Sequence, residues 1–96
     1  MRIVMNMKWT GIKPEQYEQV RNIVKWETNQ PKGAVFHVAS FDNESLRVTD
    51  IWESAEDLNA FVEKRLMPGV RQTGVQSNPQ VEISNLHATF IPALQR

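Results

Sequence analysis

His37 and Asp50 are two ionisable residues of complementary chemistry in neighbouring segments that are each rich in β-forming residues. If the turn between these segments is centred on Asn43-Glu44, facing residues have numbers that sum to 87, and His37 lies opposite Asp50. A carboxylate beside an imidazole can fix its tautomer and leave the other ring nitrogen free to act as a base or a hydrogen-bond donor. The same pair can instead serve only to fix the hairpin register, and the sequence leaves both interpretations open.

The neighbours of this pair on the same face are apolar. The same register predicts that Val35 lies opposite Trp52 and that Ala39 lies opposite Val48. Low-dielectric surroundings strengthen the coupling between an imidazole and a carboxylate. We therefore expect Trp52 to form the wall of a pocket beside the pair.

Other residues are candidates for binding a ligand. Trp9 and its neighbours Met5 and Met7 can line an aromatic pocket or form the core of a dimer. His87 lies on a predicted strand, where a lone histidine is either a ligand contact or, more often, a hydrogen-bonded structural residue. The two histidines and the scattered carboxylates lack the spacing of metal ligands, so no metal site is expected.

The elements that must position these residues follow from hydrophobic periodicity. Alternation over residues 2–9 predicts a strand, and Pro14 is suited to begin a helix that runs to about Trp26. The apolar stripe of this helix consists of Tyr17, Val20, Ile23 and Val24. Residues 34–41 and 46–52 then predict two strands joined by a turn at 42–45.

The second half of the chain repeats this alternation of helix and strand. Ser54 and Asp57 predict the cap of a second helix that stops near Met67, because the residue before Pro68 avoids helical geometry. Pro68 is expected to open a short extra turn that Gly74 closes, and residues 79–91 predict one last long strand. The resulting order βαββαβ predicts a ferredoxin-like α+β fold, a four-stranded antiparallel sheet with two helices on one face.

Both faces of the predicted sheet are apolar, and the sequence leaves open which of them meets the helices. Two helices can cover only one face, so we expect the other face to meet a second copy of the chain in a two-fold homodimer. The apolar residues opposite the Met5, Trp9 and Trp52 face are Val4, Phe36, Val38 and Ile51.

Length and composition exclude several classes of protein. A chain of 96 residues predicts a single domain over residues 1–96. Lys plus Arg and Asp plus Glu are both 11, so no net charge attracts nucleic acid or an anionic membrane, and neither is expected as a partner. The sequence lacks the GxGxxG and GxxxxGK[ST] patterns of nucleotide sites and the GxSxG pattern of an α/β-hydrolase nucleophile, so neither kind of site is expected. Without cysteine, a signal peptide or a long apolar segment, the expected location is the cytoplasm.

Three segments together resemble the antibiotic-biosynthesis-monooxygenase superfamily of dimeric α+β barrel proteins. They are Phe36-His37-Val38-Ala39, then Arg47 to Ser54, and finally Leu58, Phe61 and Leu66-Met67-Pro68. The resemblance runs from about residue 1 to residue 91, and its characteristic feature is the Trp-x-Ser start of the second helix.

This resemblance implies a ferredoxin-like protomer whose sheet closes into a barrel with that of a second copy, with a pocket between sheet and helices in each. Some members of the superfamily are cofactor-free oxygenases of polycyclic phenols or quinols, in which the carbanion of the substrate reduces oxygen. Others degrade haem, act on small quinones or have no known activity. The haem-degrading members use an asparagine, a tryptophan and a histidine. Asn6 matches the first, but Phe61 and Arg71 stand in the other two places.

The resemblance and the residues together favour a cofactor-free monooxygenase that acts on a small planar aromatic or quinone-type compound. His37 is then the base or hydrogen-bond donor, Asp50 orients it, and the further pocket residues are Trp52, Trp9, Asn6 and His87. The alternative is a non-catalytic dimeric ligand-binding or accessory protein of the same fold, in which His37 and Asp50 serve only the sheet.

Overall fold

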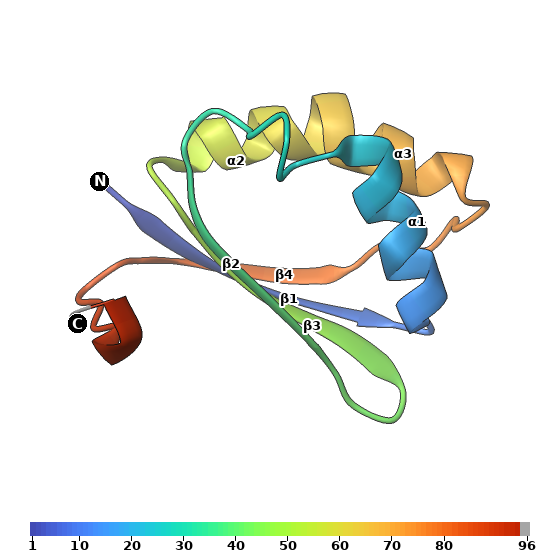
Figure 1. The fold of residues 1–96 in the computed structure, drawn as a ribbon, viewed down its shortest axis with the longest axis horizontal. Helices are drawn as coiled ribbons and strands as arrows, with labels where there is room; N and C mark the ends of the chain where they lie inside the picture. Colours follow the sequence, from blue (N-terminus) through green and yellow to red (C-terminus); the bar gives the residue numbers. More distant parts are fainter. Residues whose placement is uncertain (95–96) are drawn as a thin grey trace.

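A computed structural model describes residues 1–94, so Gln95 and Arg96 of the expected domain lie outside the described residues. Four strands, β1 (Ile3–Thr10), β2 (Ala34–Phe41), β3 (Ser45–Trp52) and β4 (Gln80–Asn85), form an antiparallel sheet in the order β2-β3-β1-β4. The helices are α1 (Pro14–Val24), α2 (Ala55–Phe61), the π-helical turn η1 (Val62–Leu66), α3 (Met67–Gln72) and the 3₁₀ turn η2 (Pro92–Leu94). Figure 1 shows α1, α2 and α3 on one face of the sheet, which confirms the ferredoxin-like α+β fold.

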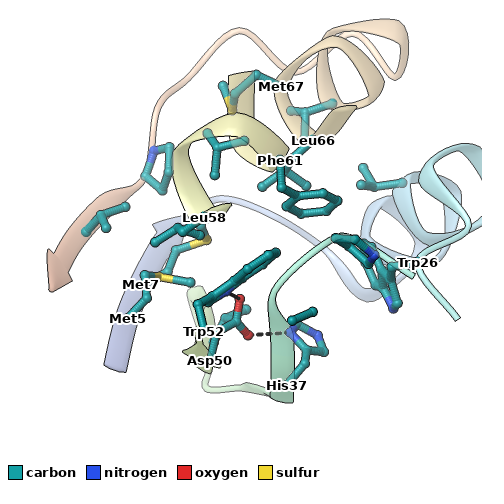
Figure 2. Close-up of a pocket in the computed structure, with 18 of the residues that line it drawn as sticks. Met5, Met7, Trp26, His37, Asp50, Trp52, Leu58, Phe61, Leu66 and Met67 are labelled. Atoms are coloured by element: carbon teal, nitrogen blue, oxygen red, sulfur yellow. Dashed lines mark hydrogen bonds and ion pairs between the residues drawn. The ribbon is translucent and has the colours of Figure 1, made fainter. Parts of the chain in front are cut away.

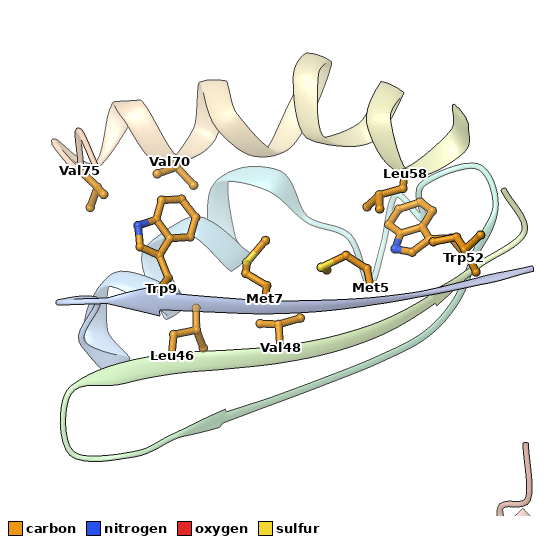
Figure 3. Packing of buried hydrophobic residues seen from close by; sticks show 10 residues of the cluster. Met5, Met7, Trp9, Leu46, Val48, Trp52, Leu58, Val70 and Val75 are labelled. Carbon is orange, nitrogen blue, oxygen red and sulfur yellow. The ribbon is translucent and has the colours of Figure 1, made fainter. Parts of the chain in front are cut away.

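Side-chain alternation decides which face the helices cover. The odd-numbered residues of β1 are buried and pair with the even-numbered residues of β3, so both strands present apolar side chains to the same side. α2 and α3 add Leu58 and Val70 from above (Figure 3). The buried core consists of Ile3, Met5, Met7, Trp9, Leu46, Val48, Trp52, Leu58, Val70 and Val75.

The β2–β3 hairpin has the predicted register over most of its length. His37 pairs with Asp50 and Ala39 pairs with Val48, as the sequence predicts. The predicted pairing of Val35 with Trp52 is wrong, because Ala34 takes that place and Val35 is an extra residue in a β-bulge.

The backbone on either side of the strand explains this bulge. The Glu53 N–H donates to the carbonyl oxygen of Gly33 at 2.8 Å, so the start of β2 is held one residue out of step with the rest of the hairpin. Gly33 has a φ of 85°, a conformation that glycine adopts without strain.

The helices begin where predicted, but two of them end elsewhere. Ser54 caps α2, because its Oγ accepts a hydrogen bond from the Asp57 N–H at 3.1 Å.

The predicted stop of the second helix near Met67 is wrong. α2, η1 and α3 follow one another without a break to Gln72, because the π-helical turn η1 changes the hydrogen-bonding pattern directly before Pro68 and so accommodates its missing N–H. α1 ends at Val24 instead of Trp26, because Lys25 is left-handed with a φ of 56°.

The last strand is shorter than predicted. β4 ends at Asn85, which pairs with Ile3 at the start of β1. Beyond this point the neighbouring strand has no further residues to pair with, and only the Leu86 N–H reaches the carbonyl oxygen of Arg2, at 3.0 Å. The chain therefore leaves the sheet before His87, and the side chain of Phe90 is 78% exposed.

The face away from the helices, the open face, is apolar at one end only. Val4, Ile51 and Phe36 pair across three adjacent strands there, and Val38 lies beside them. The other end of this face carries Lys8, Arg47 and Ser40. The helix-covered face is therefore the more apolar of the two. Among residues 1–94, no helix is both long and apolar enough to cross a membrane.

Candidate active site

A cavity of about 530 Å³ lies between the helix-covered face of the sheet and the helices (Figure 2). Its walls are mostly apolar, with Met5 and Met7 from β1 and Leu58, Leu66 and Met67 from α2, η1 and α3. This volume is within the range of pockets that bind small organic molecules. The few polar groups in its wall are therefore the ones that can orient a ligand.

The central polar group is the pair of His37 and Asp50, which faces the cavity from β2 and β3. His37 Nδ1 lies 2.6 Å from Asp50 Oδ1, and the Asp50 side chain is only 11% exposed. The second oxygen, Asp50 Oδ2, accepts the indole N–H of Trp52 at 3.1 Å. Both carboxylate oxygens thus accept hydrogen bonds. In the neutral tautomer that this arrangement favours, Nδ1 carries the hydrogen and Nε2 is an acceptor.

Tyr17 of α1 completes the chain of hydrogen bonds. Its hydroxyl lies 2.9 Å from His37 Nε2, and the two rings are nearly parallel, with an interplanar angle of 6°. Because Nε2 is the acceptor, the Tyr17 hydroxyl donates. Burial raises the pKa of Tyr17, and the nearby Arg21 guanidinium partly opposes this effect. Tyr17 therefore keeps its proton at neutral pH.

Aromatic side chains surround this hydrogen-bonded chain. The ring of Trp26 lies 5.4 Å from that of His37 and 5.7 Å from that of Tyr17, measured between centroids. On the other side, Trp52 and Phe61 lie 5.4 Å apart. These rings can stack on a planar ligand, with a polar edge at His37.

Arg65 of η1 connects the helices above the cavity. Its Nη2 donates to the carbonyl oxygens of Val24 at 2.9 Å and Asn29 at 2.7 Å, and its guanidinium lies 5.4 Å from the centroid of Phe61. One side chain thus fastens the C-terminal end of α1 and the following loop to the helix that carries Phe61. The arginine thus contacts Phe61, which lines the cavity, from the π-helical turn η1.

The structure brings four of the six residues proposed from the sequence to the cavity. His37, Asp50, Trp52 and Trp9 line it, and the indole N–H of Trp9 donates to Ser77 Oγ at 2.9 Å.

The other two proposed residues lie outside the cavity. Asn6 is on the open face, because alternation turns it away from its buried neighbours, and it accepts a hydrogen bond from Thr49 Oγ1 at 2.8 Å. His87 follows the end of β4 and is exposed, because the strand stops before it.

Sequence reasoning missed two residues of the site. Tyr17 was expected only as part of the apolar stripe of the first helix, and Trp26 only as the end of that helix. The sequence feature that could have identified Tyr17 is its phenolic hydroxyl, the one polar group in a stripe otherwise formed by Val20, Ile23 and Val24. A tyrosine hydroxyl that is even partly withdrawn from solvent usually finds a hydrogen-bond partner.

The sequence matches no family model and no curated protein. Solved structures are similar to the chain over nearly its whole length. A mutant of SnoaB, a cofactor-independent oxygenase from Streptomyces nogalater, is 13% identical with a TM-score of 0.68, and the match covers 92% of this chain and 95% of that one. A "putative antibiotic biosynthesis monooxygenase" from Chloroflexus aurantiacus is 12% identical with a TM-score of 0.67, covering 94% and 97%.

A third similar structure is NE2512, a protein of unknown function from Nitrosomonas europaea. It is 16% identical with a TM-score of 0.66, and the match covers 95% of this chain and 94% of that one. At these identities the comparison shows the fold alone, and one fold can carry several activities.

Proposed function

With the fold of the antibiotic-biosynthesis-monooxygenase superfamily as the premise, we propose that this protein is a cofactor-independent oxygenase of a small planar aromatic or quinone-type compound. The observation that carries the proposal is the His37–Asp50 pair in the wall of an apolar, aromatic-lined cavity of about 530 Å³. The similarity to SnoaB, whose own activity is that of a cofactor-independent oxygenase, supports it further.

The proposed chemistry starts with removal of a proton from an activated carbon of the substrate, such as the CH₂ group of an anthrone. The carbanion then gives electrons to O₂, a new C–O bond forms, and the peroxide anion takes the proton back from the protonated base to become a hydroperoxide. Loss of water from the hydroperoxide leaves a carbonyl group, so one oxygen atom stays on the product and the other leaves as water. The protein supplies the base and a largely apolar cavity, at whose edge the His37 side chain is 36% exposed.

His37 and Asp50 are suited to the proton-transfer step. The imidazole accepts the proton, and the Asp50 carboxylate stabilises the imidazolium that forms. The apolar surroundings strengthen this interaction. Trp52 and Trp26 form opposite parts of the wall against which a planar ring system can lie.

A second candidate function is the non-catalytic binding of the same class of ligand. It is favoured by the observation that both nitrogens of His37 already have partners, Asp50 at Nδ1 and Tyr17 at Nε2. In that case the hydrogen-bonded chain only holds the hairpin and α1 together.

Oxygen consumption distinguishes the two functions. Uptake is measured with a panel of anthrones, naphthols and hydroquinones for the native protein, His37→Ala and His87→Ala. We expect uptake that falls at least about 100-fold in His37→Ala and is unchanged in His87→Ala, which alters the other, exposed histidine. No uptake by the native protein, or equal uptake by all three, would support the binding function instead.

We also propose that the open face pairs with a second copy of the chain. Its apolar end presents Val38, 49% exposed, and Phe36, 38% exposed, beside Val4 and Ile51. Sedimentation at micromolar concentration is expected to show a dimer that Val38→Asp dissociates. Ser40→Asp, on the same strand and face but at the polar end, is the matched control. A native monomer would remove this proposal.

A cytoplasmic location and a single domain over residues 1–96 stay predictions.

A further inference from the structure

His37 offers no free nitrogen to a molecule in the cavity. Asp50 Oδ1 accepts from Nδ1 at 2.6 Å, and the hydroxyl of Tyr17 occupies Nε2 at 2.9 Å. A substrate proton can therefore reach the imidazole only if Tyr17 moves away or if Tyr17 itself carries the proton.

We propose that Tyr17 is the catalytic residue that receives the substrate proton while it passes its own proton to His37. This inference rests on the proposed function, because it assumes that the cavity is a site of proton abstraction. It changes the role of His37 from a base in contact with substrate to the group that receives a proton through Tyr17.

The hydrogen-bond partners support this order of groups. The Tyr17 oxygen donates one hydrogen bond and keeps its lone pairs, and the residue lines the cavity together with His37. Asp50 is already engaged at both oxygens, by His37 and Trp52. Glu27, the other carboxylate in the cavity wall, is paired with Arg21. Within residues 1–94, Tyr17 is thus the proton carrier of the cavity wall that is best placed for a ligand.

The position of Tyr17 is also well defined. Its ring lies 5.7 Å from that of Trp26 and meets Phe41 edge to face at 6.2 Å, measured between centroids. Together with the bond to His37, these contacts hold the hydroxyl at the edge of the space where a planar ligand would lie.

The relay balances as a single proton movement. A C–H or O–H bond of the substrate breaks, and its proton forms a new O–H bond on Tyr17. At the same time the original Tyr17 O–H bond breaks, and that proton forms an N–H bond at His37 Nε2. The substrate keeps the electron pair, and the positive charge on the imidazole lies beside the Asp50 carboxylate. The proton returns by the same route to the peroxide anion that forms from the carbanion and O₂, and this gives the hydroperoxide.

Isotope exchange without oxygen tests the relay separately from oxidation. Anthrone deuterated at its CH₂ carbon is incubated anaerobically with the protein in ordinary water, and loss of deuterium is followed by NMR. We expect the native protein to accelerate exchange and Tyr17→Phe to lower the accelerated rate at least about 100-fold. If Tyr17 only blocks His37, Tyr17→Phe uncovers Nε2, and exchange stays equal or rises, which would overturn the relay. No acceleration by the native protein would overturn it as well.

Two further variants check that the residues act together. His37→Ala and the double variant Tyr17→Phe/His37→Ala are expected to lose about as much as Tyr17→Phe alone, because members of one relay are not additive. Additive losses would contradict the relay. His87→Ala is the control, and melting temperatures verify that each variant is folded.

The same experiment separates failure of the relay from failure of the proposed oxygenase. Exchange that depends on Tyr17, without oxygen uptake under air, keeps the relay and refutes the oxygenase. Oxygen uptake that is unchanged in Tyr17→Phe keeps the oxygenase and refutes the relay.

A spectroscopic measurement adds a readout that does not depend on turnover. Tyr17 is the only tyrosine of the chain, so its ultraviolet resonance Raman bands report on a single hydroxyl. In the native protein these bands are expected to be those of a phenol that donates a hydrogen bond to an imidazole. In His37→Ala they are expected to shift to those of a phenol with another partner. Unchanged bands would contradict the Tyr17–His37 bond on which the relay depends.

Discussion

Asp50 accepts the indole N–H of Trp52 with Oδ2, although the two residues lie only two positions apart on the same strand. Side chains at this spacing share one face of a strand, so the indole can fold back onto the carboxylate. The consequence is that Oδ1 alone remains for His37, at 2.6 Å. One strand therefore supplies both the carboxylate and the group that fixes its orientation.

Replacement of Asp50 by asparagine is expected to harm both stability and turnover. An amide has one acceptor oxygen, so either the partly exposed His37 or the buried Trp52 loses its partner. We expect the free energy of unfolding, measured in urea, to fall by about 1–3 kcal/mol. Oxygen uptake is expected to fall at least about 10-fold, because the imidazolium loses its counter-charge. Native-like stability and uptake in Asp50→Asn would show that the carboxylate has no such role.

Tyr17 predicts a loss of stability in alkali. Burial raises the pKa of Tyr17 in the folded state above its usual value of 10.0. The contribution of the protonated Tyr17 to the free energy of unfolding is therefore complete below about pH 10. The contribution is lost as pH rises through the higher pKa of the folded protein. Melting temperature should therefore fall more steeply above about pH 10 in the native protein than in Tyr17→Phe. Absorbance of the single tyrosinate follows the ionisation directly, and a midpoint at or below that of free tyrosine would contradict this prediction.

Asp42 predicts a loss of stability in acid. In the β2–β3 turn its carboxylate accepts from the backbone N–H groups of Glu44 at 2.9 Å and Ser45 at 2.7 Å, and from Arg47 Nε at 2.8 Å. The bond from Arg47 contributes most to lowering the pKa of Asp42 from 3.8 to about 2. The stabilisation is complete above the pKa of the unfolded chain and disappears as pH falls through the folded value.

Asp42→Asn measures this contribution. Its melting temperature should lie below that of the native protein at about pH 6, and the difference should shrink as pH falls through about 2, where the native carboxylate takes up its proton. An equal difference at both pH values would show that the charge of Asp42 is not involved.

Gly33 and Gly11 form a matched pair for testing close packing at the start of β2. Both have a positive φ, 85° and 84°, so alanine is strained at either position. A Cβ at Gly33 would collide with the side chain of Asp57, whereas a Cβ at Gly11 would meet open space. We expect Gly33→Ala to lower the free energy of unfolding by about 1–3 kcal/mol more than Gly11→Ala, as measured in urea. Equal losses would show that Asp57 moves aside freely.

The sheet and the central pair of the site were predictable because both follow from local rules. Period-two alternation defines the strands, and the short turn at Asp42 fixes which residues face each other, so His37 and Asp50 could be paired from their numbers. The cap at Ser54 followed from the residue type and its spacing from Asp57.

The features that were not predictable depend on tertiary neighbours. Residues 86–91 continue the alternating pattern of a strand, but β1 begins at Ile3 and leaves them no partner. Helical periodicity places Tyr17 on the inner side of α1 without saying that its hydroxyl meets His37. The π-helical turn before Pro68 likewise has no signature in periodicity, and it is what carries the helix on to Gln72.

The bulge at Val35 divides β2 into two parts, each held in place by different neighbours. From His37 onward, the position of each residue is set by the turn at Asp42, whereas Ala34 and Gly33 are held by Trp52 at the end of β3 and by Glu53, which follows it. The connection between α1 and β2, which brings Trp26 to the cavity, belongs to the second group. Changes in its length can therefore be absorbed before they reach the histidine. Substitutions in this connection can thus reshape one side of the cavity while His37 and Asp50 stay paired.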